Sequence, residues 1–301
     1  MDSRIELKHL RAFSVLGEEL HFSGAAAELR VAQPALSQWI RHLERELGVR
    51  LFERTSRSVR LSDAGAVFLP RVRELLDRLE RDVEEVRRVD RGEAGTLDLG
   101  FITSAGVVVS DRLKDFAALR PDVNVRLSTG DTTQMLERLR RGSCDIGVVR
   151  DAEHETGIEL HSLRWEDFVA VLPHTHRAVG RRTVTAEQLR EDPLILFPRA
   201  SGPRAYEVNM KPFRDAGDDR RPDQECTGWH TVLQLVSRGL GVTIAPRSAT
   251  EELPDGAVVV ELDGPVPYRS EVQLAVREGD RRPVVEAFLR AAAESSPAGF
   301  E

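Results

Sequence analysis

The stretch from residue 23 to residue 61 constrains the fold of this 301-residue chain more than any other. Ser23 can cap a short helix, and the three alanines at 25–27 make its face small enough for another helix to cross closely. After a three-residue turn, Pro34 suits the first turn of a second helix and Gly48 suits its end. We therefore expect two helices joined by a tight turn, the arrangement of a helix-turn-helix.

The second of these helices is predicted to have one apolar and one polar face. A stripe facing a small core is formed by Leu36, Ile40, Leu43 and Leu47. Outside the stripe lie amides, a hydroxyl and arginines, namely Gln33, Ser37, Gln38, Arg41 and Arg45. A solvated surface is the simpler interpretation of such a face. However, the second helix of a helix-turn-helix enters the major groove N-terminal end first, where such side chains meet base edges and phosphates.

A basic hairpin is predicted after this helix. Residues 49–52 and 58–61 are expected to form two short strands around a tip at 53–57. Residues 30–60 contain seven arginines against three glutamates, a net charge of +4. An ordinary charged turn is the alternative, but a local positive field is what phosphate contact requires.

The same residues resemble the N-terminal DNA-binding domain of LysR-type transcriptional regulators. The similarity rests on Gln-Pro-Ala-Leu-Ser at 33–37, Leu-Glu at 43–44, Leu-Phe-x-Arg at 51–54 and Asp-Ala-Gly at 63–65, all at the spacing of that family. The resemblance implies a winged helix-turn-helix over residues 1–61 that binds double-stranded promoter DNA.

The resemblance also implies roles for single residues. Contacts with bases or adjoining phosphates are expected for Gln33, Pro34, Ser37 and Gln38, and contacts with the backbone or minor groove for Arg54 and Arg57. Arg41 follows on the same face and can meet phosphate or guanine. Trp39 stands where the family usually carries a polar residue. Either the base preference differs, or the ring packs beside Leu36 and Leu43.

Composition limits the other functions of the chain. Its length suggests two or three domains. The sequence has no run of about 18 or more apolar residues, the length needed to span a bilayer. The N-terminus lacks the apolar core of a signal peptide, which favours the cytoplasm. Residues 1–91 carry a net charge of +1, whereas the remainder carries −8, so nucleic acid should bind the N-terminal part. Cys144 and Cys226 are expected to be reduced and buried, with a redox switch as the less favoured alternative.

A long helix is predicted for residues 62–91. Its apolar residues alternate in steps of three and four, at Leu69, Val72, Leu76, Leu79, Val83 and Val86. Packing within the chain would explain this seam equally well, but no partner helix was identified before Gly92. We therefore expect contact with a second copy, which would present two recognition helices to paired half-sites.

Residues 92–301 alternate strand and helix patterns, which favours an α/β fold. They resemble the effector-binding domain of the same family, which is similar to periplasmic solute-binding proteins. Cys-Asp-Ile-Gly-Val at 144–148 and Ser-Arg-Gly-Leu-Gly-Val at 237–242 support the resemblance. It implies two lobes, the first at about 92–162 and 269–301 and the second at about 163–268.

Ligands of open α/β folds bind beyond the carboxyl ends of strands, where loops and helix N-termini meet. Residues predicted at such ends are Thr103, Ser104, Asp131, Thr132 and Thr227, with Arg204 and Tyr206 in a loop of the second lobe. Free N–H groups there could hold a carboxylate, although simple helix capping is equally compatible with these residue types. The loop at 197–206 resembles that of family members responding to aromatic-degradation metabolites. This implies an aromatic or dicarboxylic acid, which Asp131 would repel unless it turns away to cap the helix.

An enzyme and a non-exported solute-binding protein are the competing classes. His174-x-His176 lacks a third metal ligand in register, and no Gly-x-Ser-x-Gly or phosphate loop occurs. We therefore expect neither catalysis, metal nor cofactor. The expected partners are promoter DNA, a small-molecule inducer, further copies of the chain up to a tetramer, and RNA polymerase. An inducer can act only through unequal affinity for two arrangements of the copies.

Overall fold

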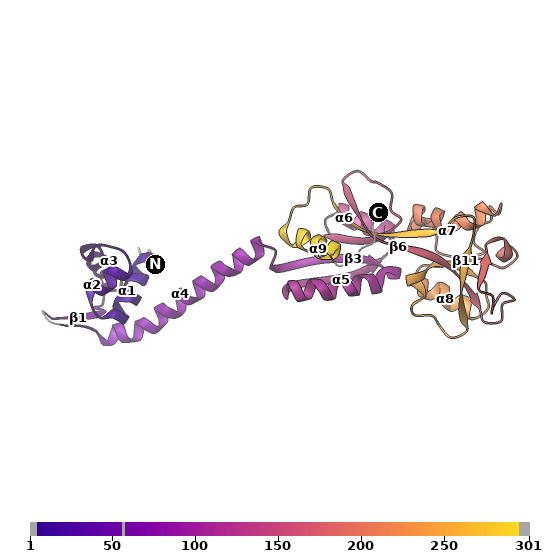
Figure 1. Ribbon diagram of the computed structural model, residues 1–301. Helices are drawn as coiled ribbons and strands as arrows, with labels where there is room; N and C mark the ends of the chain where they lie inside the picture. Colours follow the sequence, from indigo (N-terminus) through magenta and orange to yellow (C-terminus); the bar gives the residue numbers. More distant parts are fainter. Residues whose placement is uncertain (1–4, 56–57, 295–301) are drawn as a thin grey trace. The chain divides into compact units, whose positions relative to one another are not determined.

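The computed structural model describes residues 5–55 and 58–294. Contacts divide the chain into two compact units, Met1–Arg87 and Arg88–Glu301, which are described separately (Figure 1). Within the described residues, no helix is long and apolar enough to cross a membrane.

The N-terminal unit is a helical bundle with a two-stranded wing. Its elements are α1 (Leu7–Glu19), α2 (Phe22–Glu28), α3 (Gln33–Leu47), β1 (Phe52–Arg54), β2 (Val59–Leu61) and α4 (Asp63–Asp90). The apolar stripe of α3 is buried against Phe13 and Leu16 of α1 and against the alanines of α2. Pro34 lies in the first turn of α3, and Gly48 ends the helix with a φ of 71°, as predicted.

Two local expectations for this unit are wrong. Helix α2 begins at Phe22, and the cap comes from His21, whose Nδ1 accepts from the Gly24 N–H at 3.4 Å. Ser23 instead places its hydroxyl 2.8 Å from the same ring nitrogen. The wing strands are also shorter than predicted, and Phe52 pairs with Leu61. The predicted contact residue Arg57 lies outside the described residues.

The apolar seam of α4 serves two purposes, which corrects the sequence-based expectation. Leu69 and Val72 are buried in the same core as Phe13, because α1 supplies the partner helix that the sequence analysis did not identify. Farther along, Val83 is 41% exposed and Val86 is 70% exposed. Only this later part of the seam has an apolar surface left for a second copy.

The C-terminal unit is built on an eight-stranded mixed sheet. Its order is β4-β3-β5-β12-β6-β11-β7, with β10 also paired to β6. The strands are β3 (Ala94–Ile102), β4 (Asp122–Gly130), β5 (Ile146–Arg150), β6 (Ile158–Pro173), β7 (Thr183–Thr185), β10 (Thr243–Pro246), β11 (Ala257–Asp263) and β12 (Arg269–Arg277). A separate two-stranded sheet joins β8 (Ile195–Leu196) and β9 (Gln224–Glu225).

Helices pack around two separate halves of this sheet (Figure 1). Lobe I contains β3 to β5 with α5 (Gly106–Leu119), α6 (Thr132–Arg140) and α9 (Pro283–Glu294). Lobe II contains β7 to β11 with α7 (Pro203–Asp215) and α8 (Trp229–Ser237). The antiparallel strands β6 and β12 pair along their length and join the two lobes.

Some elements differ from their predicted bounds. The apolar run at 168–172 predicts a strand that starts at Phe168, but β6 begins ten residues earlier, because its first half pairs with β12. The sequence around 185–189 predicts a short helix, but the structure has the end of β7 and a 3-10 turn at Glu187–Leu189 there, since so few residues cannot sustain an α-helix. Strand β11 was not predicted at all.

Candidate functional site

Helix α3 presents a polar face at its N-terminal end. The side chains of Gln33, Pro34, Gln38 and Arg41 are exposed, and Ser37 is half-buried beside the buried Leu36. Trp39 is partly buried and packs against the core that contains Leu36 and Leu43. Its ring therefore fits the second of the two alternatives, a packing role.

Glu44 attaches the wing to α3. Its Oε1 accepts from the backbone N–H groups of Leu51 at 2.9 Å and Phe52 at 3.2 Å. Its Oε2 accepts from Arg54 Nη2 at 3.0 Å, and the Arg54 guanidinium lies 5.0 Å from the centre of the Phe22 ring. Arg54 is thus engaged within the domain, and its contact with DNA stays a prediction.

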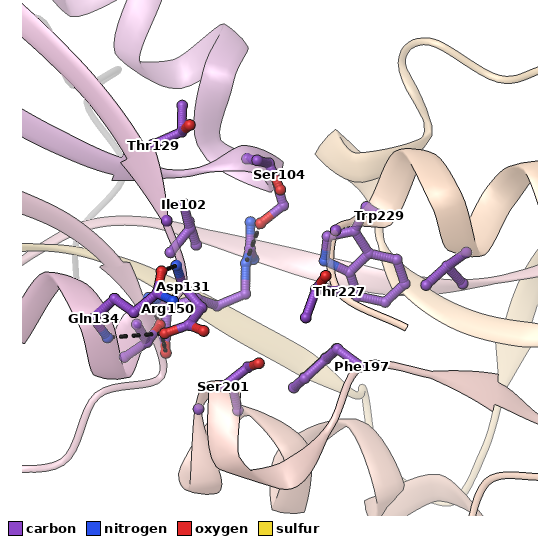
Figure 2. A pocket seen from close by; sticks show the side chains of 17 residues that line it. Ile102, Ser104, Thr129, Asp131, Gln134, Arg150, Phe197, Ser201, Thr227 and Trp229 are labelled. Carbon is purple, nitrogen blue, oxygen red and sulfur yellow. Dashed lines mark hydrogen bonds between the residues drawn. The ribbon is translucent and has the colours of Figure 1, made fainter. Parts of the chain in front are cut away.

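A cavity of about 360 Å³ lies between the two lobes of the C-terminal unit (Figure 2). It brings together five of the residues predicted for ligand binding: Thr103, Ser104, Asp131, Thr132 and Thr227. Thr103 and Ser104 follow β3, Asp131 and Thr132 open α6, and Thr227 precedes α8.

The lobe II wall of the cavity is aromatic. The rings of Phe197 and Trp229 meet edge to face with their centroids 5.8 Å apart. These rings lie opposite the hydroxyls of lobe I, and Ser201 and Thr227 place further hydroxyls beside the rings (Figure 2). Such a surface suits a ligand with a ring at one end and a hydrogen-bonding group at the other.

The buried Arg150, which was not among the predicted site residues, also lines the cavity. Its guanidinium donates from Nε to Ser104 Oγ at 3.3 Å and from Nη1 to Ser270 Oγ at 2.9 Å. The Nη2 atom donates to Ser248 Oγ and to Glu166 Oε2, each at 3.2 Å. One side chain therefore links lobe I, lobe II and both joining strands.

The charges around Arg150 are almost completely withdrawn from water. The Arg150 and Glu166 side chains are 6% and 2% exposed. Burial lowers the pKa of Arg150, and the neighbouring carboxylates oppose this shift. Burial likewise raises the pKa of Asp151, which accepts from Ser270 Oγ at 2.6 Å. Arginine stays protonated even when buried, so this cluster is a paired ionic network.

Asp131 both caps α6 and lines the cavity. Its Oδ1 accepts from the Gln134 N–H at 2.8 Å, and Gln134 Oε1 accepts from the Asp131 N–H at 3.1 Å. This reciprocal capping box fixes the start of the helix. The sequence-based alternative, that Asp131 turns away to cap, therefore describes only part of its role.

Arg204 and Tyr206 are not brought to this cavity. Arg204 lies on α7 and lines two other surface hollows, with Nε 3.9 Å from Glu153 Oε1. Tyr206 packs edge to face on Phe197, with 6.3 Å between the ring centroids, and lines a third surface hollow. The sequence analysis placed both residues in a loop of the second lobe, but they lie in the first turn of α7, and neither side chain lines this cavity.

Neither the histidine pair nor the cysteines form a reactive site. His176 Nε2 lies 3.1 Å from Asp192 Oδ2, and His174 Nδ1 lies 3.2 Å from the Gly256 carbonyl. Among the residues that the structure describes, no group of three or more His, Cys, Asp or Glu side chains could hold a metal ion. Both cysteines are free, and burial raises the pKa of each thiol, which disfavours the reactive thiolate.

Comparison with known families agrees with both halves of this description. Residues 7–66 match the family described as bacterial regulatory helix-turn-helix protein, lysR family, and residues 90–297 match the LysR substrate binding domain. The chain belongs to the LysR family. It is a LysR-type DNA-binding transcriptional regulator with an effector-binding domain.

Individual LysR-family proteins resemble the chain over nearly its whole length. The transcriptional regulator AlsR of Bacillus subtilis is 32% identical, covering 95% of this chain and 94% of AlsR. The regulator IlvR of Caulobacter vibrioides is 31% identical, covering 98% and 99%. Among solved structures, full-length CbnR in complex with its target DNA has a TM-score of 0.82 and 26% identity, covering 97% of this chain and 100% of CbnR.

Proposed function

We propose that this LysR-family regulator reads promoter DNA with the N-terminal half of α3. The observation that carries the proposal is the exposed polar face of α3, whose side chains Gln33, Pro34, Ser37, Gln38 and Arg41 have the chemistry for base edges and phosphates. Helix α3 is held by its buried stripe, so these groups are presented on a rigid element. Arg54 and Arg57 of the wing are proposed to add backbone contacts.

The proposed DNA-binding domain spans residues 1–61, the linker helix 62–91 and the effector domain 92–301. We propose that a second copy covers the exposed Val83 and Val86 of α4, and that dimers assemble further into tetramers. Paired recognition helices would then read paired half-sites. The protein would act in the cytoplasm, as a regulator and not as an enzyme, with RNA polymerase as a further partner.

The cavity between the lobes is proposed to bind the inducer. Thr103, Ser104, Thr132 and Thr227 supply hydroxyls, and the rings of Phe197 and Trp229 supply apolar area. Because Arg150 links both lobes, a ligand that disturbs its bond to Ser104 would change the balance between two lobe arrangements.

The experiment is selection of duplexes from a random pool by the full chain, followed by footprinting at several salt concentrations. We expect enrichment of a site with two related half-sites, and binding that weakens steeply with salt because phosphates are neutralised. Binding without any sequence enrichment would contradict the proposal.

A further inference from the structure

The charge inside the effector cavity is negative, and it comes from one residue. Of the described side chains that line the cavity, only Asp131 and Arg150 are charged. The Arg150 charge is already matched, because Glu166 Oε2 lies 3.2 Å from its Nη2. The half-exposed Arg164 and the buried Asp151 flank this pair, so these two arginines and two carboxylates sum to zero.

Asp131 has no such compensation. Its Oδ1 accepts the capping bond from Gln134, but no ion pair includes Asp131 in the part of the chain that the structure describes. Over the same residues, Oδ2 accepts no hydrogen bond. The carboxylate is partly exposed at the cavity wall, so its negative charge is available to a ligand (Figure 2).

Aromatic rings stand across the cavity from this carboxylate. Figure 2 shows Trp229 and Phe197 on the side of lobe II and Asp131 on the side of lobe I. The face of an aromatic ring attracts a cation through its quadrupole, most strongly for tryptophan. Asp131 on one wall and the aromatic rings on the other therefore both favour positive charge.

We propose that the inducer is an organic cation, a compound that joins an aromatic or other flat apolar group to a protonated amine. The amine pairs with Asp131 Oδ2, and the apolar group packs against Phe197 and Trp229. The inference rests on the proposed effector role of this cavity. A volume of about 360 Å³ accommodates a ring with a short side chain.

This assignment replaces the acid that the resemblance of the 197–206 loop implied. A dicarboxylate would bring two negative charges beside Asp131. The only cation in the described lining, Arg150, is already paired with Glu166. Drawing Arg150 toward a ligand carboxylate would weaken its buried pair with Glu166, whose remaining partners are Ser248 and the half-exposed Arg164.

Three probes that share a phenethyl group and differ in the charge of its substituent test the charge class: phenethylamine, phenethyl alcohol and hydrocinnamate. Titration calorimetry of the full chain should give an affinity for the amine at least about tenfold above that for the alcohol, the scale of one charge-assisted hydrogen bond. Hydrocinnamate should bind most weakly. Tighter binding of hydrocinnamate than of the amine, or binding of none of the three, would overturn the inference.

The Asp131→Asn variant separates charge from capping, because asparagine caps helices as well as aspartate does. We expect it to lose about tenfold in amine affinity and to gain affinity for hydrocinnamate. Asp255→Asn, on an exposed loop of lobe II, is the matched control and should change neither affinity. Equal amine binding by Asp131→Asn and the wild type would refute the pairing. If the amine binds no better than hydrocinnamate, the inference about ligand charge fails while selective DNA binding remains. If the full chain selects no DNA sequence, the proposed function fails.

Discussion

The carboxylate of Glu44 on α3 accepts from the Arg54 guanidinium on the wing at 3.0 Å and also from two backbone N–H groups at the start of β1. One carboxylate therefore joins α3 to the wing. Within the described part of the wing, Glu53 pairs with Arg60 and the Thr55 hydroxyl lies against that of Ser58.

Glu44→Ala should loosen the wing. Removing the acceptor leaves the N–H groups of Leu51 and Phe52 without their partner and should lower the stability of the N-terminal unit by about 1–3 kcal/mol. Urea denaturation followed by circular dichroism measures this loss. Glu53→Ala breaks the exposed Glu53–Arg60 pair and should have a much smaller effect. Equal effects of the two substitutions would contradict the role of Glu44.

Arg150→Met should destabilise the effector unit strongly. It removes the buried counter-charge of Glu166 and Asp151 and leaves Glu166 with the half-exposed Arg164 at 3.6 Å, at a cost of about 3–5 kcal/mol. Denaturant unfolding of the C-terminal unit is the measurement. The double variant with Glu166→Gln should recover part of the loss, and Arg164→Met, at the half-exposed end of the cluster, should cost far less. No recovery in the double variant would argue against the ion pair.

The stability of the N-terminal unit should depend on pH through His9. Burial, followed by the charge of the neighbouring His42 ring at 4.6 Å, lowers the pKa of His9 from 6.5. The unfolded chain therefore binds the proton on His9 more readily than the folded chain does. The contribution of the neutral His9 ring to stability is fully present above about pH 6.5 and is lost as the pH falls through the lowered pKa. Melting temperatures between about pH 7.5 and pH 5 measure this.

Replacing His9 with glutamine supplies the control for that titration. In the structure, His9 Nδ1 accepts a hydrogen bond from the Glu6 N–H at 3.1 Å. The glutamine amide oxygen can accept the same hydrogen bond, but the amide does not titrate. The pH-dependent loss should become smaller in this variant. An unchanged pH profile would assign the effect to other groups.

Val83→Glu combined with Val86→Glu should weaken self-association. Both side chains are exposed on α4, and burying two carboxylates in an apolar contact is unfavourable. Sedimentation velocity should show a shift toward smaller species at equal protein concentration, whereas Glu85→Gln on the same turn should not. Unchanged sedimentation would place the contact between copies elsewhere.

The sequence predicted α3 well because its stripe of period 3.6, Pro34 and Gly48 are all local signals. It also predicted five cavity residues, because strand ends and helix starts are marked by threonine, serine and aspartate. It did not identify Arg150, since an arginine at the end of an apolar strand ordinarily points to water. Its partners come from four segments far apart in the sequence, at Ser104, Glu166, Ser248 and Ser270. For the same reason the first half of β6 was missed. Its alternation of polar residues reflects pairing with a strand more than a hundred residues away.

The central claim is that side chains on the exposed face of α3 read bases. Affinities of Gln38→Ala and Ser37→Ala for a duplex selected by the wild type, and for a scrambled duplex of the same length, test it most directly. We expect a loss of about 1–3 kcal/mol on the selected duplex and little change on the scrambled one, since phosphate contacts are retained. Equal losses on both duplexes would contradict base reading by these residues.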